Sequence, residues 1–191
     1  MFAFIYLTVA AILVAATYVA LRAAGAYFRF RGTRLITCPE TQRPAAVCVD
    51  AGYSAITAPF GKTKLQLSDC SRWPERRACG QECLKQVELA PGECLVRTIL
   101  TRWYRDKLCV FCRKPLDDVN WLEHKPGLMS PDGRSVEWYE VPPETLPEVL
   151  ATHRPVCWNC HVAETFRHAF PELVIDRHRP DQRTVVENQQ E

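Results

Sequence analysis

The sequence predicts an α+β fold in which one N-terminal transmembrane helix precedes a small soluble domain of two lobes. Three observations carry this prediction. The first 21 residues contain no charged side chain, segments with strand-like and helix-like periodicity follow them, and the chain of 191 residues contains 10 cysteines. Lobes of roughly 70 residues bury too little apolar surface to be stable unaided. We therefore expect the cysteines to hold metal ions that stabilise the soluble domain.

The charge balance narrows the classes of partner. The chain has 24 Lys and Arg against 22 Asp and Glu, a formal net charge of +2. Proteins that grip nucleic acid usually carry a strong basic excess, so we expect no nucleic-acid partner. The sequence also contains no P-loop, nucleophile elbow, H-E-x-x-H zinc motif or dinucleotide-binding fingerprint.

Residues 1–28 form the predicted membrane anchor. A helix over its first 21 residues is about 30 Å long, which matches the apolar core of a bilayer. A cleaved signal peptide has a basic residue before a shorter apolar stretch, and no basic residue precedes this one. Four arginines follow it: Arg22, Arg29, Arg31 and Arg34. Because positive flanks stay in the cytoplasm, we predict a single-pass membrane protein whose C-terminal domain is cytoplasmic. In that reducing compartment we expect cysteines to be metal ligands or packing residues, not disulfides.

Residues 32–107 form the predicted first lobe, a cysteine-rich region of short strands followed by two helices. Strands are expected where apolar and polar residues alternate between turns rich in proline and glycine: residues 34–37, 45–50, 54–58 and 64–67. One helix is expected from about Gly80 to the residue before Pro91. The other is expected from Glu93 to Lys107, where apolar residues recur at nearly helical spacing.

Residues 108–177 form the predicted second lobe. The dipeptide Asp132-Gly133 is typical of a hairpin turn, and a strand-like segment over residues 135–141 follows it. A final helix is expected over residues 159–168. Residues 178–191 are polar and lack apolar periodicity, so we predict a disordered tail.

Two Cys-x-x-Cys pairs are the strongest chemical signal in the second lobe: Cys109 with Cys112, and Cys157 with Cys160. Four thiolates in such pairs can wrap a tetrahedral Zn²⁺. The second pair lies at the predicted start of a helix, whose dipole favours anionic thiolates. The gap between the pairs is longer than in a typical zinc ribbon, and the predicted hairpin fills it. We therefore predict a zinc site with these four ligands.

A Cys-x-x-Cys turn, a hairpin and a second pair that opens a helix resemble a treble-clef or zinc-ribbon module over about residues 109–170. The segments CVFCRKPL, LEHKPG and CWNCH are also similar to the zinc-containing HNH nucleases. That similarity implies His124 as the general base and His161 as a metal ligand. The middle asparagine of the nuclease pattern has no match in this chain.

The segment CWNCH, which ends at His161, allows a third interpretation, because Cys-x-x-Cys-His is the pattern of c-type haem attachment. The two thiols would form thioethers and His161 would be the proximal iron ligand. The candidates for the distal ligand are Met129, His124, His153 and His168. This alternative requires the domain to lie outside the cytoplasm, against the arginine flanks.

A second group of cysteines lies in the first lobe: Cys38, Cys70, Cys79 and Cys83. Cys79 and Cys83 stand four residues apart near a predicted helix start, so both can face one site. Four thiolates hold either zinc or an iron–sulfur cluster, and zinc is favoured because no ferredoxin spacing is present. Alternatively, these four are buried thiols that pack in the core. We expect Cys48 and Cys94 to be packing residues.

A zinc ion closed by four thiolates has no open coordination position for catalysis. We therefore predict a membrane-tethered scaffold or accessory protein with structural zinc, which binds another protein and is not an enzyme. In this interpretation His161 is only a helix residue beside the site. The alternatives are a c-type haem electron-transfer protein and an HNH-like nuclease.

Overall fold

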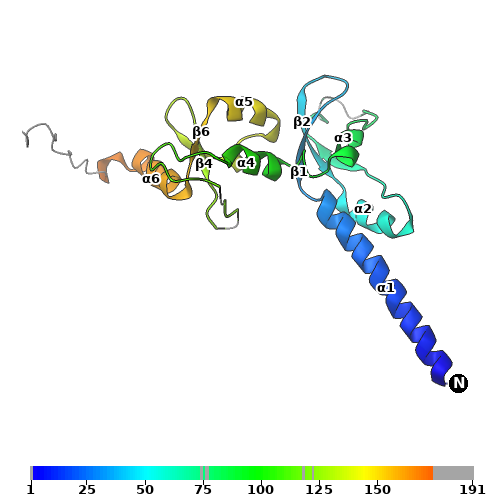
Figure 1. Ribbon diagram of the computed structural model, residues 1–191. Coiled ribbons are helices and arrows are strands. Elements are labelled where there is room, and N and C mark those ends of the chain that lie inside the picture. Colours follow the sequence, from blue (N-terminus) through cyan, green and yellow to red (C-terminus); the bar gives the residue numbers. More distant parts are fainter. Residues whose placement is uncertain (1, 74, 76–77, 118, 122, 174–191) are drawn as a thin grey trace, which may run out of the picture.

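Figure 1 shows the computed structural model, in which one long helix leads into two small bodies that lie side by side. The structure describes residues 2–73, 75, 78–117, 119–121 and 123–173. Its mixture of helices and antiparallel sheets agrees with the α+β class that the sequence predicts. The predicted tail, residues 178–191, lies outside the described residues.

Helix α1, Phe2–Phe30, is long and apolar enough to cross a membrane, and it is the only such helix in the described part of the chain. Its most apolar window has a mean hydropathy of 2.3, and none of that window is buried by the rest of the protein. The hydroxyls of Thr8 and Thr17 each donate to a carbonyl of the same helix at 2.8 Å. These polar groups therefore need no partner outside α1.

Arg34 joins α1 to the first lobe. It lies on β1, Thr33–Thr37, and its side chain is fully buried. The guanidinium donates to the carbonyls of Phe30 at 2.5 Å, Arg29 at 2.7 Å and Gly32 at 2.9 Å. The end of a helix leaves such carbonyls without partners, and its negative dipole end favours a cation. The last of the four flanking arginines is thus a buried cap on α1.

The first lobe is built on an antiparallel sheet in the order β1-β2-β3. β2 spans Pro44–Val49 and β3 spans Leu67–Cys70. The strands expected at 34–37 and 45–50 are confirmed, whereas β3 lies further along the chain than the expected 64–67. The sheet buries apolar residues against the end of α1 and against α3: Phe30, Ile36, Val47, Leu67 and Val87.

The strand expected over residues 54–58 is wrong. These residues belong to helix α2, Ala51–Thr57, and to the 3-10 helix η1, Ala58–Phe60. A local cap overrides the strand pattern, because the Asp50 carboxylate accepts a hydrogen bond from the Tyr53 N–H at 2.8 Å. α2 also lies beside the end of α1, and Ser54 is its buried residue.

The two helices that follow are shorter than expected. α3 spans Leu84–Leu89 and α4 spans Val96–Tyr104. Just outside them, Gln81 and Asp106 have φ angles of 54° and 60°, which take the backbone out of the right-handed helical region. The helical pattern of the sequence continues past these points, but the helical backbone conformation ends there.

The second lobe contains another antiparallel sheet, in the order β5-β4-β6. β4 spans Gly127–Met129, β5 spans Ser135–Glu137 and β6 spans Arg154–Val156. β4 and β5 form the expected hairpin, and Gly133, with φ of 86°, occupies its turn. The strand expected over residues 135–141 ends at Glu137, because the chain turns there into a 3-10 helix over Trp138–Glu140. The final helix, α6, spans Trp158–Ala169 and confirms the helix expected there.

Helix α5, Leu146–Thr152, is not among the helices expected from the sequence, and Pro142, Pro143 and Pro147 lie within it or just before it. Proline is tolerated in the first turn of a helix, where its missing N–H would have no partner, and Pro147 lies there. Three short 3-10 helices complete the elements of the described chain: η2 Trp138–Glu140, η3 Pro143–Thr145 and η4 Pro171–Leu173.

Helix α4 packs on the second lobe, although it lies within the range predicted for the first. Its Val96 and Leu100 form a buried cluster with Leu146 of α5. Tyr104 belongs to the core of the second lobe, and its hydroxyl donates to the Gly127 carbonyl of β4 at 2.9 Å. The two lobes therefore meet at α4.

Candidate metal centre

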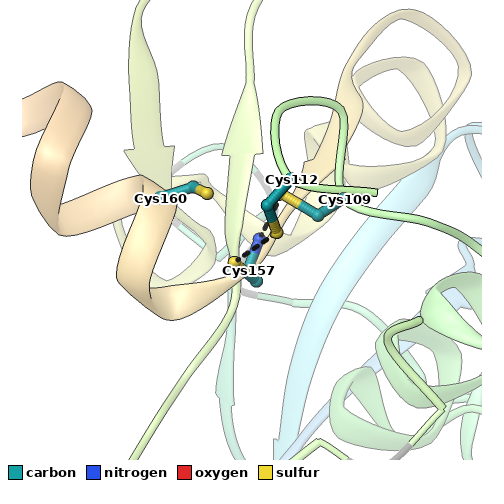
Figure 2. A group of neighbouring side chains, drawn as sticks. All are labelled: Cys109, Cys112, Cys157 and Cys160. Carbon is teal, nitrogen blue, oxygen red and sulfur yellow. Dashed lines mark hydrogen bonds between the residues drawn. The ribbon is translucent and has the colours of Figure 1, made fainter. Parts of the chain in front are cut away.

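Four sulfur atoms from the two Cys-x-x-Cys pairs meet in the second lobe. The Sγ atoms of Cys109, Cys112, Cys157 and Cys160 all lie within 4.8 Å of one another (Figure 2). Metal–sulfur bonds of about 2.3 Å in a tetrahedral site place the sulfurs about 3.8 Å apart. The group can therefore hold one metal ion after small side-chain adjustments.

The first pair lies in a tight turn that begins at Cys109. The Cys109 N–H donates to the Lys114 carbonyl at 2.9 Å, and the Arg113 N–H donates to the Cys109 carbonyl at 3.0 Å. Arg113 has φ of 61°, in the left-handed region. The turn, which we call the knuckle, therefore holds both cysteines of the first pair in one tight loop.

The second pair opens α6. Cys157 is the N-cap residue, Cys160 lies in the first turn, and the His161 N–H donates to the Cys157 carbonyl at 2.9 Å. The positive end of the helix dipole therefore faces the pair and favours thiolates. The Val110 N–H donates to the Pro155 carbonyl of β6 at 3.0 Å, which holds the knuckle against the strand that leads into this helix.

The four thiols have different environments. Cys109 is buried, whereas Cys112 is exposed. Burial raises the pKa of the Cys109 thiol, but N–H groups of Cys157, Cys112 and Phe111 outweigh burial and lower this pKa to about 6. The first of these donors lies 3.3 Å from the Cys109 sulfur. Burial raises the pKa values of Cys157 and Cys160, and the neighbouring thiols raise them further. Thiolates this close repel one another, and a cation among the sulfurs would offset that repulsion.

His161 is a buried link between α6 and the hairpin. Its Nδ1 lies 2.6 Å from the Ser135 hydroxyl, and its Nε2 lies 3.6 Å from Oε1 of Glu137. A Cβ added at Gly127 of β4 would lie 2.9 Å from the ring. The ring therefore fixes the helix that carries Cys157 and Cys160, a larger role than the one expected from the sequence. No local signal could reveal it, because the partners of His161 lie far away along the chain.

His124 lies at the surface, with 59% of its side chain exposed. It lines a cavity of about 300 Å³ together with Cys157, Trp158 and Asn159. The rings of His124 and His161 lie 6.4 Å and 6.0 Å from the Trp158 ring, measured between ring centroids. The two histidines of the nuclease similarity therefore both lie beside Trp158.

The other candidate haem ligands lie elsewhere in the second lobe. Met129 is buried in β4. His153 has its Nδ1 2.9 Å from the Thr152 hydroxyl. His168 has its Nε2 3.3 Å from the Gly133 carbonyl in the hairpin turn.

The second group of cysteines lines one small cavity in the first lobe: Cys38, Cys70, Cys79 and Cys83. The cavity has a volume of about 40 Å³. Burial, together with the charges of Cys70, Cys79 and Cys38, raises the pKa of Cys83 to about 11, so these thiols are within electrostatic range of one another. Among the described residues, only the Cys109 group brings its ligand atoms within 4.8 Å.

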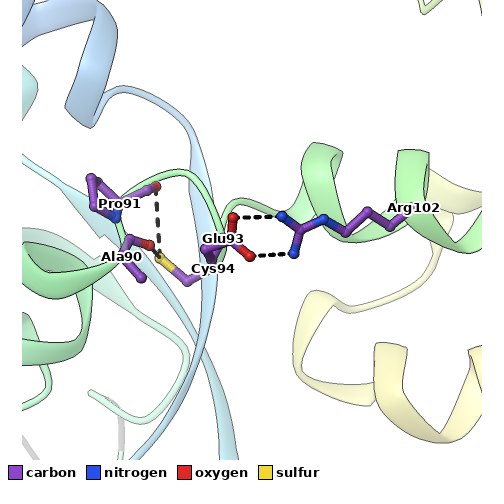
Figure 3. A network of polar contacts seen from close by, with 5 residues as sticks. All are labelled: Ala90, Pro91, Glu93, Cys94 and Arg102. Carbon is purple, nitrogen blue, oxygen red and sulfur yellow. Dashed lines mark hydrogen bonds and ion pairs between the residues drawn. The ribbon is translucent and has the colours of Figure 1, made fainter.

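Cys48 and Cys94 belong to neither group. The Cys48 sulfur lies 3.6 Å from the Thr33 hydroxyl. The Cys94 thiol donates to the Ala90 carbonyl at 3.4 Å, next to the ion pair of Glu93 with Arg102 (Figure 3). Both cysteines make local contacts of the kind that packing residues make.

No protein-family model matches this chain, and no curated protein or solved structure matches it significantly. The geometry of the site is therefore the basis on which a function can be proposed.

Proposed function

We propose that this chain is a single-pass membrane protein whose soluble domain holds a structural Zn²⁺ and serves as a scaffold or accessory factor for another protein. The meeting of four sulfurs from two distant segments carries the proposal. Soft thiolate ligands favour zinc over hard cations such as Mg²⁺ or Ca²⁺. Four of them also close the coordination sphere, so the ion organises the fold and has no position for a substrate.

The order of elements supports a treble-clef-like module. A knuckle at Cys109, the β4–β5 hairpin and helix α6 follow one another, and the second cysteine pair begins the helix. In this chain α5 and β6 are inserted between the hairpin and the helix. Zinc would join the knuckle to the start of α6 and so replace apolar core that a small lobe lacks.

The contacts of His161 favour zinc over the two alternatives. Haem attachment requires His161 to bind iron, yet its ring is buried and its two nitrogens face Ser135 and Glu137. A nuclease centre would need the same ring to share a metal site with His124. Either function requires His161 to give up the contacts that hold α6 on the hairpin.

The end of α1 supports the membrane part of the proposal. Arg22 is the first charged residue after the apolar stretch, and its Nη2 donates to the Ala58 carbonyl of η1 at 3.3 Å. Ile56 and Phe60, beside this contact, are 70% and 84% exposed. Large apolar side chains at this level would enter the lipid interface. The arginines beyond the span favour a cytoplasmic soluble domain.

An apolar stripe on α6 supports the proposal that the domain binds another protein. Val162, Phe166 and Phe170 recur every four residues on one face of the helix, and each is nearly half exposed. The rings of Phe166 and Phe170 lie 5.2 Å apart between centroids. Leu173, in η4 just after α6, is also exposed, at 61%. We infer that a partner protein covers this stripe with an apolar surface of its own.

Metal analysis of the full chain in detergent tests the zinc assignment. We expect at least one zinc per chain, with loss of one equivalent in the Cys160→Ser variant. Cys48→Ser is the matched control and should lose none. Stoichiometric iron with visible absorption would contradict the proposal and favour haem or an iron–sulfur cluster.

Site-specific photo-crosslinking in cells tests the partner surface. A crosslinker at Phe166 should give a discrete adduct with one other protein, whereas a crosslinker at the adjacent, exposed Thr165 should give less of it. No adduct at either position, or an adduct only with a second copy of this chain, would contradict the scaffold role.

A reporter active only outside the cytoplasm, fused to the C-terminus, tests the membrane orientation. It should be inactive if the soluble domain is cytoplasmic.

A further inference from the structure

The geometry points to a second metal site in the first lobe, and we propose that Cys38, Cys70, Cys79 and Cys83 bind a second Zn²⁺ as thiolates. All four line the same cavity of about 40 Å³. A cavity needs roughly 10–15 Å³ to hold a water molecule, so this one has room for an ion. The inference goes beyond the proposed function, which depends on the other four cysteines.

The backbone around Cys38 repeats the turn found at Cys109. The Cys38 N–H donates to the carbonyl of Arg43, five residues on, at 2.9 Å. The N–H of Gln42, four residues on, donates to the Cys38 carbonyl at 2.8 Å, and Gln42 has φ of 54°. The turn at Cys109 has the same two hydrogen bonds and a φ of 61° at the corresponding Arg113.

The agreement extends to the ends of the turn. Each turn is closed by a pair of residues that face each other: Thr37 with Pro44, and Leu108 with Pro115. The first lobe therefore contains a second zinc knuckle by backbone geometry. Its sequence conceals it, because Thr41 stands where the other turn has its second cysteine.

The remaining ligands reach the cavity from two other segments. Cys70 ends β3, while Cys79 and Cys83 lie in the segment before α3. Cys70 and Cys83 are buried in the core of the lobe. An ion held by all four would link the β1–β2 turn, the last strand of the sheet and the segment leading into α3. The described residues of that last segment form no helix or strand before Leu84, so the segment has most to gain from the link.

A half-buried arginine also faces this cavity. Arg72 lines it, and its Nε is a buried donor with no hydrogen-bond partner among the described residues. The Nη2 atom of the same guanidinium forms an ion pair with Oε2 of Glu75 at 3.6 Å. Buried donors are rarely left unpaired. A metal-bound thiolate carries negative charge and accepts hydrogen bonds, so an occupied site would give this Nε an acceptor.

The test compares zinc content in matched variants of the full chain in detergent. We expect two zinc per chain in the natural sequence, one in Cys79→Ser, one in Cys160→Ser and none in the double variant. Cys48→Ser lies in the same lobe outside the cavity and should keep two. One zinc in the natural protein, lost with Cys160→Ser and unchanged with Cys79→Ser, would overturn the second site alone. The reverse pattern would overturn the proposed function and leave the second site intact.

Thr41→Cys sharpens the test, because Thr41 occupies the fourth position of the turn and lines the cavity. In the Cys79→Ser background this change should restore the second zinc. Failure to restore it would contradict the equivalence of the two turns. If Cys79→Ser does not fold, cobalt binding to the natural sequence decides the matter. Two equivalents of Co²⁺ with the absorption of four-thiolate sites are expected, and saturation at one equivalent would overturn the proposal.

Discussion

The turn at Cys38 and the turn at Cys109 have the same backbone and different fourth residues. Both contain the same pair of hydrogen bonds and a residue with φ near 60°. In the second lobe the fourth residue is Cys112, and four sulfurs approach within 4.8 Å. In the first lobe it is Thr41, and the four cysteines line one cavity. A Cys-x-x-Cys spacing reveals ligands that are neighbours in the sequence. The backbone hydrogen bonds reveal the turn itself, whichever residue stands at its fourth position.

Removal of one cysteine ligand from the second lobe should have the largest effect on stability, and it shows which elements belong to that lobe. The apparent binding free energy of structural zinc, about 10–16 kcal/mol, exceeds the total stability of many domains. Cys160→Ser should therefore unfold the second lobe. Because α4 packs on that lobe, hydrogen exchange should accelerate from Val96 onward and not only from Leu108. Unchanged protection of α4 would show that it belongs with the first lobe.

Arg34→Met should disturb the other lobe. The change leaves three carbonyls at the end of α1 without their donor, at about 1–3 kcal/mol for each buried group. Arg31→Met removes the same charge from an exposed position and is the control. Thermal unfolding and proteolysis near residue 32 should reveal a loosened junction only in Arg34→Met. Equal effects of the two changes would mean that charge alone matters at this place.

His161→Ala should weaken the second lobe by a smaller amount and retain its zinc. The change removes a buried ring and its contacts with Ser135 and Glu137, at a cost of about 2–4 kcal/mol. Gly127→Ala is the complementary variant, because its methyl group would press on the ring and cost about 1–3 kcal/mol. Denaturant unfolding and zinc content measure both variants. Loss of zinc in His161→Ala as complete as in Cys160→Ser would make His161 a ligand.

Glu93→Gln should have the smallest effect. The hydrogen bonds from Arg102 lower the pKa of the Glu93 carboxyl, and both side chains are exposed (Figure 3). Because the folded pKa is the lower one, the pair stabilises the fold at neutral pH, and this is lost as the pH falls through the folded value. Solvent and salt screen such a pair. Melting temperatures of the natural and variant chains should differ slightly at pH 7 and low salt, and should agree in acid or at high salt.

Features that depend on neighbouring residues could be predicted from the sequence. The apolar stretch of α1, the Asp-Gly hairpin, the start of α6 and the two Cys-x-x-Cys pairs are all local patterns, and the structure contains each of them. Helix α2 was missed, because the Asp50 cap and the surface of α1 outweigh the strand propensity of its residues. Helix α5 was missed, because a proline in a first turn resembles a proline that breaks a helix.

The sequence alone determined that this chain has one membrane-length helix and enough paired cysteines for a thiolate site. Only the tertiary structure decided that Arg34 caps that helix, that His161 fastens α6 to the hairpin and that four separate cysteines share one cavity. These are contacts between residues far apart in the chain. Their energy comes from burial and from hydrogen bonds made across the fold, which no short segment of sequence contains. The knuckle at Cys38 lies between these cases, because its turn is local but its function as a ligand turn depends on cysteines brought to it from elsewhere.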